Sequence, residues 1–224
     1  MHLKKSRQFG RFLRPLVRTL KRPFVARRKS RPVDQVHLAL VIPLNDEVAE
    51  HLTKIQIEIF RKYGYNPGLD AYPHITLKMG FPVKHLAPFE DYMEYLASRI
   101  TPFEISTGGF DFFDDGIMFL GVESNPQLER IRQEILADLS EKHGIMPETV
   151  EGAQFRFHVT LAYGLSNKEF AELRESYASR HLQFTFTARH IDLFCHTGQQ
   201  WVTCKRAVFR GADPIALKTS SRSS

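Results

Sequence analysis

Cysteine is scarce in this 224-residue chain, which contains only Cys195 and Cys204. Two cysteines cannot build the disulfide framework of a small secreted domain, and they are typical of a reducing compartment. The chain also lacks any apolar run that approaches the ~20 residues of a transmembrane helix. These absences favour a cytoplasmic protein without a transmembrane segment.

Acidic residues are missing from the first 32 positions, which carry 12 Lys and Arg. The rest of the chain has 19 basic and 25 acidic side chains, so the net charge of +6 comes from this arm. Pro15 interrupts the helical spacing of its apolar residues, which predicts at most a short helix. We therefore expect residues 1–33 to be a basic arm, partly disordered or a short helix, that contacts an anionic surface. An organellar targeting sequence and a solvated tail are alternatives, so an organelle stays open beside the cytoplasm.

The body of the chain alternates strand and helix patterns. Residues 36–44 indicate a buried strand, and residues 46–63 have the period of an amphipathic helix that Gly64 ends. Two similar passes follow, each with a strand, a helix and further strands that carry an Asp between apolar residues. In the second pass a single strand is predicted over residues 184–194. The pattern predicts an α+β fold built from a duplicated unit within residues 34–212. The last residues, 213–224, are expected to be a disordered tail.

Two nearly identical tetrapeptides stand 84 positions apart in the two passes, HITL at 74–77 and HVTL at 158–161. Successive side chains of a strand point to opposite faces, so residues two apart share a face. The polar faces are therefore expected to carry Tyr72, His74, Thr76 and Lys78 in the first copy, and Arg156, His158 and Thr160 in the second. A third His-x-Thr, at 51–53, falls inside the expected helix and is interpreted as a coincidence.

Two imidazoles that face each other across a groove can perform concerted acid–base chemistry, because the ordinary pKa of histidine, ~6.5, lies near neutrality. One takes a proton from water while the other gives one to a leaving oxygen. The hydroxyls of Thr76 and Thr160, with Lys78 or Arg156, would stabilise developing negative charge. A single His-x-Thr is more often the polar face of a sheet, and two His alone are a thin metal-ligand set. The duplication in matching context favours catalysis.

At these positions the chain resembles the two-histidine phosphoesterase superfamily, whose signature is a pair of His-apolar-Thr/Ser-apolar motifs. The resemblance covers roughly residues 36–211, and members include RNA 2′,3′-cyclic phosphodiesterases and bacterial 2′-5′ RNA ligase-like proteins. It implies a bilobal fold, with two pseudo-symmetric lobes that each have an antiparallel sheet and outer helices around a central groove. It also implies that His74 and His158 are the acid–base pair, that Thr76 and Thr160 hold phosphate oxygens, and that no metal or other cofactor is required.

One departure from the family concerns the cation that many relatives carry soon after the second motif, where this chain has Tyr163. The phosphate charge would instead be met by one of four basic residues: Lys78, Arg156, Lys205 or Arg206. Tyr72 or Tyr163 would stack on a base without strong sequence preference. The expected substrate-binding set is therefore Tyr72, Lys78, Arg156 and Tyr163.

The resulting hypothesis is a monomeric, metal-independent phosphoric diester hydrolase that opens 2′,3′-cyclic phosphates of RNA or small nucleotides to 2′-phosphates. A phosphodiesterase for 2′-5′ or 3′-5′ linked oligonucleotides is the first alternative, because the same histidine pair serves either substrate. A non-catalytic RNA-binding protein that acts through the basic arm is the second alternative. A structural domain that keeps the fold without the chemistry is the third.

Overall fold

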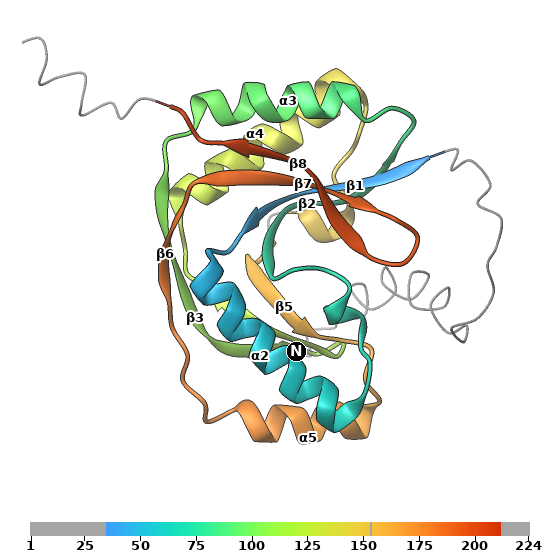
Figure 1. The fold of residues 1–224 in the computed structure, drawn as a ribbon, viewed down its shortest axis with the longest axis vertical. Coiled ribbons are helices and arrows are strands. Elements are labelled where there is room, and N and C mark those ends of the chain that lie inside the picture. Colours follow the sequence, from blue (N-terminus) through green and yellow to red (C-terminus); the bar gives the residue numbers. More distant parts are fainter. Residues whose placement is uncertain (1–34, 153, 212–224) are drawn as a thin grey trace, which may run out of the picture.

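The computed structural model describes residues 35–152 and 154–211. Within these ranges the chain is α+β, as expected, with four α-helices and eight strands (Figure 1). The helices are α2 (Asp46–Tyr63), α3 (Ala87–Arg99), α4 (Pro126–His143) and α5 (Asn167–Tyr177), with two short 3-10 helices, η1 (Pro67–Leu69) and η2 (Thr149–Glu151). The strands are β1 (Val36–Pro43), β2 (His74–Val83), β3 (Phe103–Phe113), β4 (Ile117–Val122), β5 (His158–Ala162), β6 (Thr185–Ala188), β7 (His190–His196) and β8 (Trp201–Val208). The expected basic arm and C-terminal tail lie outside the described residues.

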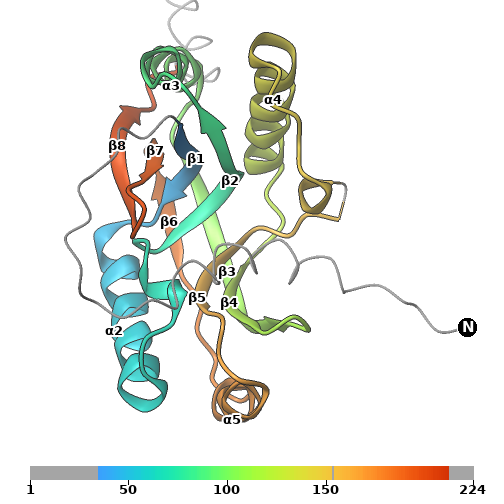
Figure 2. The same ribbon diagram turned by 90° about the vertical axis from the view of Figure 1, so that its right-hand side faces the viewer.

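The eight strands form one antiparallel sheet, in the order β6-β3-β4-β5-β2-β1-β7-β8. Its two central strands, β2 and β5, carry the two His-x-Thr motifs. Figure 2 shows that the sheet is strongly curled, with α3 and α4 toward one end of the molecule and α2 and α5 toward the other. The antiparallel strands and outer helices were expected, but they belong to one continuous sheet instead of one sheet per lobe.

The boundaries of α2 follow from its end residues. The Asn45 side chain accepts a hydrogen bond from the Val48 amide at 3.1 Å, which satisfies one of the donors that a helix N-terminus leaves without partners. At the other end Gly64 has a φ of 80°, which glycine adopts without steric strain, and its amide donates to the Phe60 carbonyl. The helix predicted over 46–63 is confirmed.

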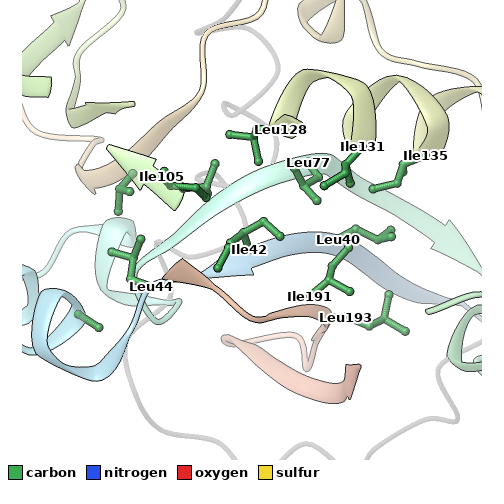
Figure 3. Close-up of a cluster of buried hydrophobic side chains, with 14 of the residues drawn as sticks. Leu40, Ile42, Leu44, Leu77, Ile105, Leu128, Ile131, Ile135, Ile191 and Leu193 are labelled. Carbon is green, nitrogen blue, oxygen red and sulfur yellow. The ribbon is translucent and has the colours of Figure 1, made fainter. Parts of the chain in front are cut away.

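The two faces of the sheet differ in what covers them. Leu40 and Ile42 of β1 belong to the main core (Figure 3). All four helices contribute apolar side chains to this core. Ala39 and Val41, which alternate with Leu40 and Ile42 along β1, point to the other face and form a small separate cluster there with Phe194. The main core fixes the sheet, and the second face carries the polar motifs.

One expected strand is wrong. Residues 184–194 were predicted as a single strand, but they form β6 and β7, separated by Arg189. β6 pairs with β3 at one edge of the sheet, whereas β7 pairs with β1 and β8 near the other edge. Because a single residue connects two strands that are far apart in the strand order, the two flanks of the sheet meet there and the sheet curls.

Candidate active site

The register of the two central strands brings the motifs together. Ile75 of β2 pairs with Val159 of β5, and both side chains are fully buried in the main core. Since the strands are antiparallel, His74 aligns with Thr160 and Thr76 aligns with His158, all on the opposite face. The structure therefore places the four residues named from the sequence side by side. The third His-x-Thr lies inside α2, as expected.

Both imidazoles are held in the same way. The Nδ1 atom of His74 lies 2.7 Å from the carbonyl oxygen of Tyr72, and the Nδ1 atom of His158 lies 2.7 Å from the carbonyl oxygen of Arg156. A carbonyl oxygen only accepts hydrogen bonds, so each Nδ1 carries the proton. In the neutral ring the Nε2 lone pair is then left to accept a proton, and in the charged ring Nε2–H is left to donate one.

Aromatic rings wall each histidine. The His74 ring packs edge-on against Phe194, with 4.9 Å between centroids. The His158 ring packs edge-on against Phe113 at 5.2 Å and in a tilted orientation against Phe119 at 5.1 Å. These rings exclude water from one side of each imidazole and limit its rotation. Two histidines with the same tautomer and the same type of support are suited to proton transfer in opposite directions.

The electrostatic surroundings of the two histidines differ. Burial lowers the pKa of His74, while its hydrogen bond to the Tyr72 carbonyl and the negative charge of Asp192 act in the opposite direction. Burial, together with the positive charges of His74 and Arg156, lowers the pKa of His158 to about 4, against the opposite effect of the hydrogen bond to the Arg156 carbonyl. His74 is therefore the histidine with an acidic neighbour, and His158 is the one with basic neighbours.

An aspartate lies two strands away from each threonine, in the same order on both sides. Val41 of β1 pairs with both Thr76 and Asp192, which sets these residues in one row across the sheet. Phe119 of β4 pairs in the same way with Thr160 and Asp111. Each row starts at a motif threonine and ends at an aspartate.

Each of these aspartates binds an arginine. Asp192 is 1% exposed and accepts two hydrogen bonds from Arg206, from Nε at 2.9 Å and from Nη2 at 2.8 Å. Asp111 accepts one from Nη2 of Arg156 at 2.6 Å, and this interaction lowers the pKa of Asp111 against its partial burial. Both arginine side chains remain about half exposed, so they can still contact a phosphate.

Three of the four expected substrate-binding side chains lie near the motifs. Tyr72 is half exposed and its carbonyl orients His74. The guanidinium of Arg156 lies over the rings of Phe113 and Phe119, the same rings that wall His158. Tyr163 directly follows β5 and is partly buried, and this burial raises the pKa of its phenol to about 12.

The fourth, Lys78, does not share the polar face, and the prediction that it does is wrong. Leu77 has no partner between the pairs Val41–Thr76 and Leu40–Lys78, so it forms a bulge that shifts the alternation of β2. Lys78 is consequently turned inward, is 1% exposed, and pairs with Glu151 at 2.5 Å. Its charge is committed to a buried carboxylate and is not available to a substrate.

The aromatic rings around the histidines were not predicted, although the sequence contains a signal for them. Asp111-Phe112-Phe113 and Asp192-Leu193-Phe194 repeat the pattern Asp-x-Phe in corresponding strands. Alternation along each strand puts the Phe on the same face as the Asp. A second duplicated motif therefore accompanies His-x-Thr.

Two other features of the described residues offer less chemistry. No three His, Cys, Asp or Glu side chains in residues 35–152 and 154–211 gather closely enough to hold a metal ion. A hollow of about 120 Å³ lies between α2 and α5, but its lining, which includes Ile59, Leu173 and the ion pair of Glu58 with Arg180, contains no histidine. None of the helices in these ranges combines the length and hydropathy that a membrane span needs.

The sequence and the fold of this chain are similar to those of known proteins. The sequence profile of the 2′-5′ RNA ligase superfamily matches residues 43–200. A Thermus thermophilus protein of known structure is similar in fold, with a TM-score of 0.59 at 19% identity over 79% of this chain and 100% of that one. Escherichia coli LigT in complex with 3′-AMP is similar, with a TM-score of 0.59 at 18% identity over 78% of this chain and 98% of that one. The LigT complex with phosphate has a TM-score of 0.54 at 17% identity, over 79% and 99% of the two chains. A search of curated proteins finds no match.

Proposed function

Because the chain belongs to the 2′-5′ RNA ligase superfamily of two-histidine phosphoesterases, we propose that it is a phosphodiesterase that opens 2′,3′-cyclic phosphates to 2′-phosphates. The observation that carries the proposal is the pair of imidazoles on adjacent central strands, each with Nδ1 bonded to a carbonyl and Nε2 left for proton transfer. The substrate class is RNA with a cyclic phosphate end, or a small cyclic nucleotide. The LigT complexes with 3′-AMP and phosphate support a nucleotide ligand for this fold.

The electrostatic difference between the histidines supports a division of roles. His158, whose pKa is about 4, is neutral at physiological pH, so its Nε2 takes a proton from the attacking water. The water oxygen then forms a bond to phosphorus while the bond from phosphorus to the 3′ oxygen breaks. His74 then gives a proton from Nε2–H to the departing 3′ oxygen, and the negative charge of Asp192 favours that proton against burial, which lowers the pKa of His74.

The threonines and Arg156 serve the charge that develops on phosphorus. The hydroxyls of Thr76 and Thr160 lie on the same face as the imidazoles and donate hydrogen bonds to the non-bridging oxygens. Arg156, which is anchored by Asp111 beside His158, supplies the positive charge that this family often places at the position of Tyr163. Tyr72 and Tyr163 border the motifs and offer faces for a base.

The matched rows from threonine to aspartate support a fold of two related halves. One half would comprise β2, β1, β7 and β8, and the other β5, β4, β3 and β6. A rotation that exchanges these halves would exchange His74 with His158 and Asp192 with Asp111. In this proposal the motif is duplicated because each half of the fold contributes one histidine to the site.

The test is the conversion of a nucleoside 2′,3′-cyclic phosphate by purified protein in the presence of EDTA, with product analysis. We expect a 2′-phosphate from the wild type and loss of turnover by about 10²- to 10⁴-fold in both His74→Ala and His158→Ala. A folded wild type without turnover would overturn the proposal. Cleavage of 2′-5′ or 3′-5′ linked dinucleotides in place of the cyclic phosphate would show that the same histidine pair acts on linked oligonucleotides.

A further inference from the structure

The seam between the two central strands is short. β5 forms four residue pairs with β4, but β2 and β5 are joined by the single pair Ile75–Val159. The relative position of the two histidines therefore depends on few main-chain hydrogen bonds. Another contact is needed to hold the segment before β5 against β2.

The side chain of Glu151 provides that contact. Glu151 ends the short helix η2, seven residues before His158, and is 2% exposed. Its Oε2 accepts from Lys78 Nζ at 2.5 Å, and its Oε1 accepts from the Met79 amide at 2.7 Å. Lys78 and Met79 follow Thr76 by two and three residues in β2. The carboxylate thus connects the approach to the second motif with the strand of the first.

The segment that carries Glu151 is itself fixed from within. The Glu148 amide donates to Oε2 of Glu151 at 2.8 Å, and the Glu151 carbonyl accepts from Nη2 of the buried Arg132 in α4. The Arg132 guanidinium also lies 3.9 Å from the ring centroid of Phe155. A movement of β2 would therefore act through Glu151 on η2, seven residues before His158.

We propose that Glu151 is a positioning residue, which through Lys78 and the Met79 amide sets His158 and Thr160 at their working distance from His74 and Thr76. The inference rests on the proposed function for its catalytic consequence, because positioning matters where two groups act on one phosphate. The bulge at Leu77 makes this interaction possible, because it turns Lys78 away from the polar face and toward the carboxylate of Glu151. Ion pairs buried this deeply are usually no more stabilising than apolar residues of the same volume, which favours a role in geometry.

The experiment compares three variants with the wild type. Glu151→Gln keeps the size of the side chain but places an amide where Lys78 needs a negative charge. Lys78→Met with Glu151→Met removes both charges and leaves an apolar pair. We therefore expect this double variant to fold even if Glu151→Gln does not. Leu173→Ala in α5, at the opposite end of the molecule from α4 (Figure 1), is the control for a loss of stability without a change at the seam.

Two readouts separate positioning from stability. The first is kcat and KM with the cyclic phosphate: we expect a loss of about tenfold or more in kcat with little change in KM, because a misplacement of about 1 Å between reacting groups costs up to ~10²-fold. The second is the electrostatic coupling of the histidines, measured by NMR as the change in the His158 pKa that His74→Ala causes. This coupling should shrink in Glu151→Gln and in the double variant, and stay unchanged in Leu173→Ala.

Unchanged kcat and unchanged coupling in a folded Glu151→Gln, or their full recovery in the double variant, would overturn the proposal. The same holds if Leu173→Ala reduces the coupling as much as Glu151→Gln does. If the wild type shows no turnover, the proposed function fails but the coupling measurement still decides whether Glu151 sets the distance between the histidines.

Discussion

The low pKa of His158 makes a quantitative prediction about stability in acid. The unfolded chain holds this histidine at its ordinary pKa of 6.5, whereas the folded protein holds it at about 4. The folded state therefore disfavours the proton, and the stabilisation is fully present above pH 6.5 and is lost as the pH falls toward 4. Between about pH 7 and pH 5 the linkage relation gives a loss of about 2 kcal/mol in the free energy of unfolding from this one ring. The value is a ceiling, because part of the ring is exposed and solvent screens its charge.

His158→Gln removes the titrating group and keeps a polar side chain of similar length. The free energy of unfolding would be measured by urea denaturation near pH 7 and near pH 5, with the fluorescence of the single tryptophan, Trp201, as the signal. The wild type should lose about 2 kcal/mol more than the variant between the two pH values. The exposed His85→Gln controls for the removal of an imidazole from the surface. Equal losses in wild type and His158→Gln would refute the claim that burial and neighbouring cations keep this ring neutral.

Three further predictions concern single side chains. Asp192→Asn removes the negative charge that raises the His74 pKa, so fewer His74 rings are protonated at a given pH and the alkaline limb of the kcat/KM profile should move to lower pH. Arg156→Gln should raise KM for the cyclic phosphate several-fold and raise the His158 pKa in an NMR titration, since the charge that lowers this pKa is lost. Asn45→Ala removes the side-chain cap of α2 and should lower the free energy of unfolding in urea denaturation by about 1 kcal/mol.

The local pattern of apolar and polar residues predicted much of the fold. The helix over 46–63 was predicted to the residue, because Asn45 and Gly64 mark its ends chemically and its apolar period is regular. The motif strands were found because alternation and duplication reinforce each other. The break at Arg189 was not found, because residues on both sides of it have strand character and only pairing with different neighbours separates β6 from β7.

The candidate site was predicted in its two histidines and two threonines, which local alternation places on one face. Lys78 was predicted on the wrong face because one unpaired residue, Leu77, reverses the alternation of side chains along β2. The tetrapeptide HITL contains no signal for such a bulge. The interaction of Lys78 with Glu151 joins residues 73 positions apart, so it depends on the packing of η2 against β2. Long-range partners of this kind are determined by tertiary structure and not by sequence spacing.

The pairing of Ile75 with Val159 also has a consequence for how the molecule folds. It closes a loop of 84 residues, and the chain entropy lost in such a closure is about 4 kcal/mol before any contact compensates it. The first strand, β1, likewise pairs with β7, which is close to the end of the described residues. Contacts this distant in sequence slow folding, so refolding should be dominated by the late assembly of the central strands. An N-terminal fragment that ends before β5 contains one histidine without its counterpart, and the paired site comes into existence only when the sheet is completed.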